Sequence, residues 1–203
     1  MSHVNRIKVA VSGVCIAMMS ACSSVPITSY PKLASMNPET MDMREIEIAV
    51  RLQDDFGIIE DSVVIDVSLV HEETGEMLQE QFILEQSPAP LTSALERKLK
   101  QGYEIHRYRM SRDTGEAITA YRDQIVALRN AEPGDQHEGT FSASAGVCRN
   151  EGANPFLVPR MTLLIRTSPK DDFFTMFKET KVPLPVDETG KQKTCATAAD
   201  ASD

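Results

Sequence analysis

Apolar side chains recur at every second position in several stretches of the chain, and this alternation predicts half-buried β-strands. The clearest stretch places four apolar residues on one side of an extended chain: Ile46, Ile48, Val50 and Leu52. Alternation or an apolar run marks six further predicted strands, at 63–70, 78–84, 103–110, 139–149, 161–167 and 173–181. Strands 63–70 and 78–84 are predicted to form a hairpin, because Gly75 in the turn between them tolerates a positive φ.

Two stretches repeat their apolar residues at helical spacing instead. The first helix is predicted over 87–102, with Pro88 at its start and Gly102 just past its last turn. Its apolar face carries Leu91, Leu95 and Leu99. The second is predicted over 113–132, where Asp113 and Glu116 have the spacing of a capping box. Its apolar face carries Ile118, Tyr121, Ile125 and Leu128, and its arginines, Arg122 and Arg129, are predicted to point away from that face.

The order of these elements predicts an α+β fold. Most neighbouring strands are separated by short turns, which favours antiparallel pairing. We therefore expect an antiparallel sheet or sandwich of about seven strands, with the two helices inserted mid-chain to cover one face. An immunoglobulin-like β-sandwich is the alternative, although the chain lacks the tryptophan and the spaced cysteine pair of antibody-type domains.

The first 24 residues have a different pattern, that of an export signal. Arg6 and Lys8 precede an apolar stretch over 9–19, which is shorter than the ~20 residues that a membrane-spanning helix needs. The stretch ends in Met19-Ser20-Ala21-Cys22. This motif resembles the lipobox of bacterial lipoproteins, in which an aliphatic residue and two small residues precede a cysteine; Met19 stands where leucine is usual.

The resemblance implies a diacylglycerol thioether on Cys22, cleavage before Cys22 and acylation of the new amino terminus. Two or more acyl chains anchor a protein stably, since each buried CH₂ contributes roughly 0.8 kcal/mol. In enterobacteria an aspartate after the cysteine retains a lipoprotein at the inner membrane. By that resemblance, Ser23 predicts attachment to the outer membrane, facing the periplasm. The chain also resembles uncharacterised lipoproteins of proteobacteria, a likeness that implies no activity.

Two other interpretations of the amino terminus stay open. One is a plain secretory signal cut near Ala21, which leaves Cys22 as an ordinary thiol. The other is a cytoplasmic protein with an apolar start. The lipoprotein interpretation divides the chain into a signal peptide at 1–21, a lipidated and proline-containing tether at 22–43, one globular domain at 44–182 and a mostly disordered tail at 183–203.

Charge excludes one large class of partners. Removing residues 1–21 takes away Arg6 and Lys8 and no acidic residue, so the formal charge changes from −9 to −11. An acidic chain of this kind lacks the basic footprint of a nucleic-acid-binding protein. Anionic head groups would also repel the folded domain, so the lipid on Cys22 is the expected membrane contact.

Two cysteines remain once Cys15 leaves with the signal and Cys22 carries the lipid. Cys148 and Cys195 are an even pair in a compartment that favours oxidation, and we expect a disulfide between them. The alternative is a buried Cys148 thiol and a free Cys195.

The motifs of common enzymes and metal sites are not visible in the sequence. His71 lacks a second histidine four residues later, and His106 and His137 are isolated. The acidic pairs at 54–55 and 171–172 supply too few ligands for a calcium loop, and we expect no cofactor and no metal.

One group of residues is a candidate ligand patch: Tyr103, Arg107 and Arg109, on one predicted strand face. Arginine offers a two-pronged donor to a carboxylate or a glycan. The alternative is that these arginines pair with the many acidic residues of the domain.

The sequence therefore predicts a lipid-anchored protein of the cell envelope that binds or scaffolds a partner without catalysis. Two alternatives remain: an envelope enzyme that acts on peptidoglycan or lipid, and an accessory subunit of a transport or secretion complex.

Overall fold

The computed structural model describes residues 41–131, 137–186, 188 and 190–195. Its largest layer is a five-stranded sheet with the strand order β10-β9-β1-β6-β5. In that order, the strands are Phe174–Lys181, Arg160–Arg166, Glu47–Gln53, Tyr103–Arg109 and Glu85–Gln86. The central strand β1 pairs with β6 and β9, and both pairings are antiparallel.

A three-stranded sheet with the order β4-β3-β7 forms the second layer, from Met77–Ile83, Val64–His71 and His137–Ser144. A two-stranded sheet joins β2 (Phe56–Ile58) to β8 (Val147–Arg149). The described helices are η2 (Met43–Glu45), α2 (Ser93–Glu96) and α3 (Arg112–Ala131). All pairings between these named strands are antiparallel, which confirms the predicted α+β fold with mid-chain helices.

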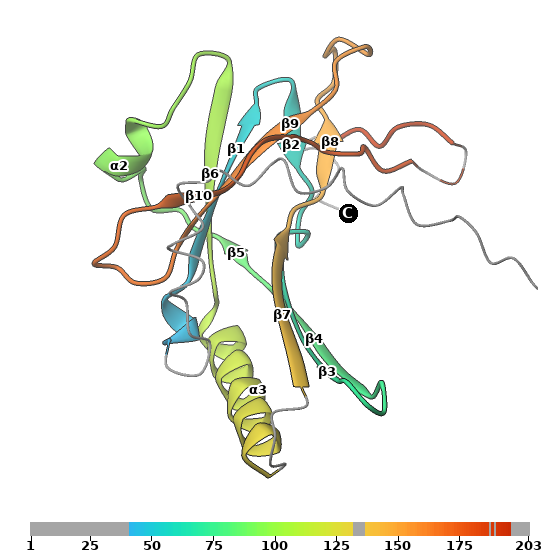
Figure 1. Cartoon of the computed structure of the whole chain (residues 1–203). Coiled ribbons are helices and arrows are strands. Elements are labelled where there is room, and N and C mark those ends of the chain that lie inside the picture. The colour runs from blue at the N-terminus through green and yellow to red at the C-terminus, as the bar shows by residue number, and fades with distance from the viewer. Residues whose placement is uncertain (1–40, 132–136, 187, 189, 196–203) are drawn as a thin grey trace, which may run out of the picture.

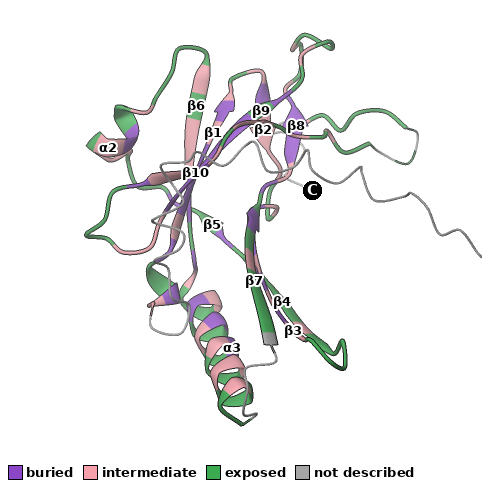
Figure 2. Cartoon of the chain, viewed as in Figure 1, coloured by how far each residue is buried: buried purple, intermediate pink, exposed green. Residues whose placement is uncertain are grey.

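The main core lies between the two larger sheets and reaches under α3 (Figure 2). It takes Ile48, Val50 and Leu52 from β1, the side chains that the period-two pattern placed on one face. From β3 and α3 it takes Ile65 and Ile118, both fully buried. The alternation at 46–52 therefore predicted both the strand and its core-facing side.

The opposite face of the five-stranded sheet has a smaller apolar cluster under α2. Ala49, Leu95, Leu164 and Phe173 form it, and all four are buried. Figure 1 shows α2 on one side of this sheet, whereas α3 lies beside β3, β4 and β7 at one end of the molecule. The two helices therefore cover different surfaces, and only α3 reaches the second sheet.

The helix predicted over 87–102 is wrong in length, because only Ser93–Glu96 is helical. Thr92 caps this single turn by accepting a hydrogen bond from the Leu95 amide. Leu95 is fully buried, but Leu99 is 49% exposed, so the sheet face offers cover for one turn only. Proline at 88 and 90 further disfavours a helix before Thr92.

The strand predicted over 139–149 is divided into β7 and β8 by Ala145 and Gly146. A Cβ added to Gly146 would lie 2.9 Å from the Cβ of Ser62. The Ser62 hydroxyl accepts a hydrogen bond from the Gly146 amide, and Gly146 in turn accepts one from the amide of Ile59. At this close crossing the chain leaves the three-stranded sheet and enters the two-stranded sheet. The single predicted strand therefore becomes two strands, β7 and β8.

Helix α3 begins one residue earlier than predicted and has a different cap. The Ser111 hydroxyl accepts a hydrogen bond from the Thr114 amide at 3.1 Å. Glu116 does not reach back to cap the helix; it pairs with Arg112 at 3.0 Å, one turn along an exposed surface. Asp113 lies in the first helical turn, where its charge suits the positive end of the helix dipole.

Part of the predicted tail returns to the body of the domain. Cys148 and Cys195 form a disulfide with a Cα–Cα distance of 5.0 Å. The Cys195 amide also donates to the carbonyl oxygen of Arg149. The bridge confirms the predicted pairing and attaches residues 190–195 beside β8.

Residues 1–40 lie outside the described part of the chain, and the predicted signal peptide, Cys22 and most of the tether fall within them. None of the helices that the structure does describe combines the length and the apolar character that crossing a membrane requires.

Candidate functional site

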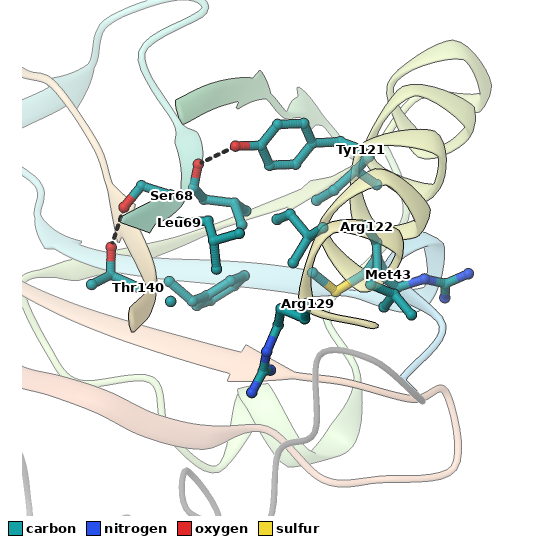
Figure 3. A pocket seen from close by; sticks show the side chains of 13 residues that line it. Met43, Ser68, Leu69, Tyr121, Arg122, Arg129 and Thr140 are labelled. Carbon is teal, nitrogen blue, oxygen red and sulfur yellow. Dashed lines mark hydrogen bonds between the residues drawn. The ribbon is translucent and has the colours of Figure 1, made fainter. Parts of the chain in front are cut away.

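A pocket of about 240 Å³ lies between α3 and the three-stranded sheet (Figure 3). Its walls come from η2, β3, β7 and α3. The lining residues are Met43, Val67, Ser68, Leu69, Ile118, Tyr121, Arg122, Ile125, Val126, Arg129, Gly139, Thr140 and Phe141. Most of these side chains are apolar, and none is acidic. The pocket is therefore suited to hold an apolar group.

The sheet side of the pocket is apolar because of strand alternation. Val67 and Leu69 of β3 face α3, and their register partners on β7 are Phe141 and Gly139. Alternation turns the hydroxyl groups of Ser68 and Thr140 to the other face, where they hydrogen-bond to each other at 2.6 Å. Since Gly139 carries no side chain, no side chain lies directly opposite Leu69 on β7.

The helix side of the pocket presents Ile118, Tyr121 and Ile125 on one face of α3. The Tyr121 hydroxyl donates a hydrogen bond to the main-chain oxygen of Val67 at 3.3 Å. The Tyr121 ring meets Phe82 edge to face, with ring centroids 5.8 Å apart. Burial, and secondarily the charge of Glu80, raise the pKa of Tyr121 above its usual value, so the hydroxyl stays protonated and satisfied at neutral pH.

Among the described residues that line the pocket, Arg122 and Arg129 are the only ones with charged side chains. The sequence pattern predicted that both point away from the apolar face; both are nevertheless among the residues that line the pocket, while the guanidinium of Arg129 extends away from the apolar side chains (Figure 3). The two arginines stand seven residues apart, or two helical turns, so they lie on the same side of α3. Arg122 donates to Asp123 at 2.8 Å and to the main-chain oxygen of Met41 at 3.2 Å.

The residues of the predicted ligand patch are not among those that line this pocket. Arg107 is 7% exposed, and its guanidinium donates to Glu47 at 2.9 Å and to the main-chain oxygen of Pro90 at 2.5 Å. Arg166 from β9 binds the same Glu47 oxygen at 2.9 Å. Arg107 thus pairs with an acidic residue, as the alternative interpretation of the patch predicts.

The other two patch residues lie in different surroundings. Tyr103 is flanked by cations, with Lys100 at 4.8 Å and Arg51 at 5.7 Å from its ring centroid. Lys100 also donates to Glu179 at 2.9 Å, and this hydrogen bond lowers the pKa of Glu179. Arg109 is exposed at the end of β6. Of the three patch residues, Arg107 is the one that joins the ion group around Glu47.

The histidines are spread over separate elements. The Nδ1 atom of His71 accepts hydrogen bonds from the amides of Glu73 and Thr74, which organises the hairpin turn. His106 lies on β6, with its Nε2 atom 3.5 Å from Glu104. The main chain of His137 pairs with that of His71 at the end of β3 and β7. Within the described residues, no group of three or more His, Cys, Asp or Glu side chains is arranged to hold a metal ion.

The pocket is the feature that sequence reasoning missed. One signal was present, because the apolar stripe of α3 continues to Ile125 and Leu128, beyond the residues that the core buries. Leu128 is 40% exposed, and Ile125 is only partly buried. A second signal was Gly139, a residue without a side chain opposite an inward-facing position of β3.

Comparison with known protein families, curated proteins and solved structures found no match.

Proposed function

We propose that this chain is a lipid-anchored lipoprotein of the bacterial envelope whose domain binds a hydrophobic ligand without transforming it. The observation that carries the binding role is the apolar pocket between α3 and the sheet β4-β3-β7. Concave apolar sites with a few polar groups are the usual form of ligand-binding sites. The pocket lining of this chain has that composition.

The chemistry of the lining favours binding over catalysis. No histidine, cysteine, aspartate or glutamate is among the described residues that line the pocket. Its one phenol, Tyr121, is already engaged with Val67. General acid–base catalysis needs a titratable group within hydrogen-bond reach of the substrate.

The proposed location rests on the sequence and is supported by the disulfide. The order of charged, apolar and small residues before Cys22 resembles a lipoprotein signal. The Cys148–Cys195 bridge suits a compartment such as the periplasm, because disulfides are rare in reducing cytoplasm. The proposal therefore places the domain in the periplasm, attached to the outer membrane through Cys22.

The anchor is tested by metabolic labelling with palmitate. We expect label on the wild-type chain in the outer-membrane fraction and none on Cys22→Ala. Label that persists on Cys22→Ala would exclude lipidation at this residue.

The binding role is tested by placing a photoreactive amino acid at Val126, inside the pocket, in the full chain in living cells. The matched control has the same amino acid at Asp123, whose side chain is 64% exposed on the same helix. We expect a small-molecule adduct at Val126 and not at Asp123. Protein adducts at Val126 in place of the small molecule would instead support an accessory subunit, and a chemically altered substrate would support an enzyme.

A further inference from the structure

We propose that the pocket receives the alkyl chain of a single-chain anionic lipid, of which a long-chain fatty acid is the simplest. The anionic head group would remain at the mouth, beside the arginines of α3. This inference names the ligand class of the site described above and so rests on the proposed binding function. Three properties of the site carry it: the interior, the volume and the charge at the mouth.

The interior offers nothing for a polar ligand to bind. Val67, Leu69 and Ile118 present hydrocarbon, and the Tyr121 hydroxyl is already satisfied by a main-chain oxygen. The paired hydroxyls of Ser68 and Thr140 belong to the other face of the sheet. Apolar cavities take apolar guests. An alkyl chain therefore gains apolar contacts here without breaking the hydrogen bond of Tyr121.

The volume limits the number of chains. A cavity of roughly 150 Å³ holds one benzene ring. At about 240 Å³, this pocket has room for one medium-length alkyl chain or the end of a longer one. Two parallel acyl chains would not fit, which favours a single-chain lipid over a diacyl phospholipid.

The charge at the mouth selects the head group. Arg122 and Arg129 line the site, and no acidic residue is among its described lining residues. Figure 3 shows the guanidinium of Arg129 extending away from the apolar side chains. Arg122 is already paired with Asp123 at 2.8 Å, so the attraction of a carboxylate or phosphate at this edge comes mainly from Arg129, whatever partner that guanidinium also has in the protein. A cationic amphiphile would be repelled.

The position of the pocket relative to the proposed anchor is also suitable. Arg122 binds the main-chain oxygen of Met41, so the chain enters the domain beside the pocket. Cys22 precedes Met41 by 19 residues, and a fully extended segment of that length spans at most about 65 Å. A lipidated Cys22 would therefore keep the pocket within reach of single-chain lipids that leave the membrane.

The test uses the full chain in envelope membranes and a palmitic acid probe with a photoreactive diazirine in its chain. After illumination, mass spectrometry locates the label. We expect label on peptides from α3 and from 137–144, and competition by unlabelled palmitate. Label spread over the domain, or label at the pocket that palmitate does not displace, would overturn the proposal.

Two substitutions that fill the pocket test the location. Gly139→Val is suitable because a Cβ at Gly139 would meet only Leu69 and Ser68, each at 3.8 Å. We expect labelling of the pocket peptides to fall at least about tenfold, the effect of losing roughly 1.4 kcal/mol of binding. Ser142→Val, on the opposite face of β7, is the matched control and should label normally. Val126→Phe on α3 provides a second blocking variant if Gly139→Val does not accumulate, and unchanged labelling in it would refute the location.

The head-group assignment is tested with a second pair of variants and probes. Arg129→Gln should reduce labelling by the fatty acid about fivefold or more, whereas Arg112→Gln, exposed at the start of the same helix, should not. A diacyl phosphatidylglycerol probe with the same diazirine should label the pocket poorly, and an alkylamine probe should not label it. Equal labelling by all three probes would overturn the selection of a single-chain anion. If the photoreactive amino acid at Val126 captures a small molecule that is not a single-chain anionic lipid, this inference is contradicted and the proposed binding function still stands.

Discussion

Glu47 on β1 and Arg107 on β6 form an ion pair with a nitrogen–oxygen distance of 2.9 Å, and their side chains are only 16% and 7% exposed. Arg166 binds the same carboxylate at 2.9 Å, so one half-buried anion pairs with two cations from the strands on either side of β1. Three central strands are therefore joined by charge as well as by main-chain hydrogen bonds.

Replacing Glu47 with Gln should destabilise the domain by about 3 kcal/mol, because it leaves Arg107 and Arg166 desolvated without an anion. Chemical denaturation of the variant and the wild type measures this difference. The matched control is Glu116→Gln, which breaks the exposed Arg112 pair on α3 and should cost less than about 0.5 kcal/mol. Equal effects from both substitutions would show that burial does not control the strength of the pair.

Gly146 and Gly139 provide a matched pair of glycines in and next to β7. Gly146→Ala should cost about 1–3 kcal/mol, since its Cβ would lie 2.9 Å from the Cβ of Ser62, at a crossing held by main-chain hydrogen bonds. Gly139→Ala should change the free energy of unfolding by less than about 0.5 kcal/mol, because its Cβ would make ordinary contacts at 3.8 Å. Thermal or urea denaturation distinguishes the two, and a neutral Gly146→Ala would contradict the tight crossing.

Local patterns in the sequence predicted most of the strands because the strands follow local rules. β1 and β3 each turn alternate side chains towards the main core, Ile48 and Val50 in β1 and Ile65 and Val67 in β3. Gly75 has a φ of 71° in the hairpin turn, as expected. The helix over 87–102 failed because its length depends on what covers it, and only Leu95 finds a buried site under the sheet. The spacing of Leu91, Leu95 and Leu99 indicates an apolar helix face. It does not show how much of that face the sheet covers.

The candidate site depends even more on contacts between distant segments. Arg107 looked available for a ligand in the sequence, yet its partner Glu47 lies 60 residues earlier. The pocket forms where α3 continues past the main core and faces β3 and β7. Strand β3 lies about 50 positions before the helix in the sequence, and β7 follows the helix. The apolar periodicity of α3 places Ile125 on the inward face of the helix. It does not show whether side chains of β3 and β7 fill the space opposite Ile125. The disulfide was predictable because only Cys148 and Cys195 remain once Cys15 and Cys22 are assigned to the predicted lipoprotein signal.

Asp42 should titrate well below an ordinary aspartate. Its carboxylate accepts hydrogen bonds from the side chain of Arg44, at 2.7 and 2.9 Å, and from the Arg44 amide at 3.1 Å. The side-chain hydrogen bonds are the main reason that the pKa of Asp42 falls from 3.8 to about 2. Carboxyl NMR titration should find this value, and Arg44→Gln should return the pKa towards 3.8. Arg112→Gln, which lies outside this cluster, should leave it at about 2.

The same shift gives a small pH dependence of stability. Because the folded pKa of Asp42 is lower than the unfolded one, its contribution is complete above about pH 4 and is lost as the pH falls towards 2. The side chain is 37% exposed, so solvent screening keeps this contribution below about 1 kcal/mol. Asp42→Asn should remove it, and the stabilities of variant and wild type should converge at pH 2.

The Cys148–Cys195 bridge should stabilise the domain through the chain that it closes. The two cysteines are 47 positions apart, and a loop of that length corresponds to roughly 4 kcal/mol in the chain-entropy model. Cys195→Ser and reduction of the wild type should therefore lower the free energy of unfolding by similar amounts, up to about 4 kcal/mol. Gly57 offers a further check, since a Cβ there would lie 2.8 Å from the Cys195 Sγ. Gly57→Ala should destabilise the oxidised protein more than it destabilises Cys195→Ser, where the variant side chain is no longer held by the bridge and can move aside. An equal effect in both backgrounds would show that Gly57 is needed for another reason.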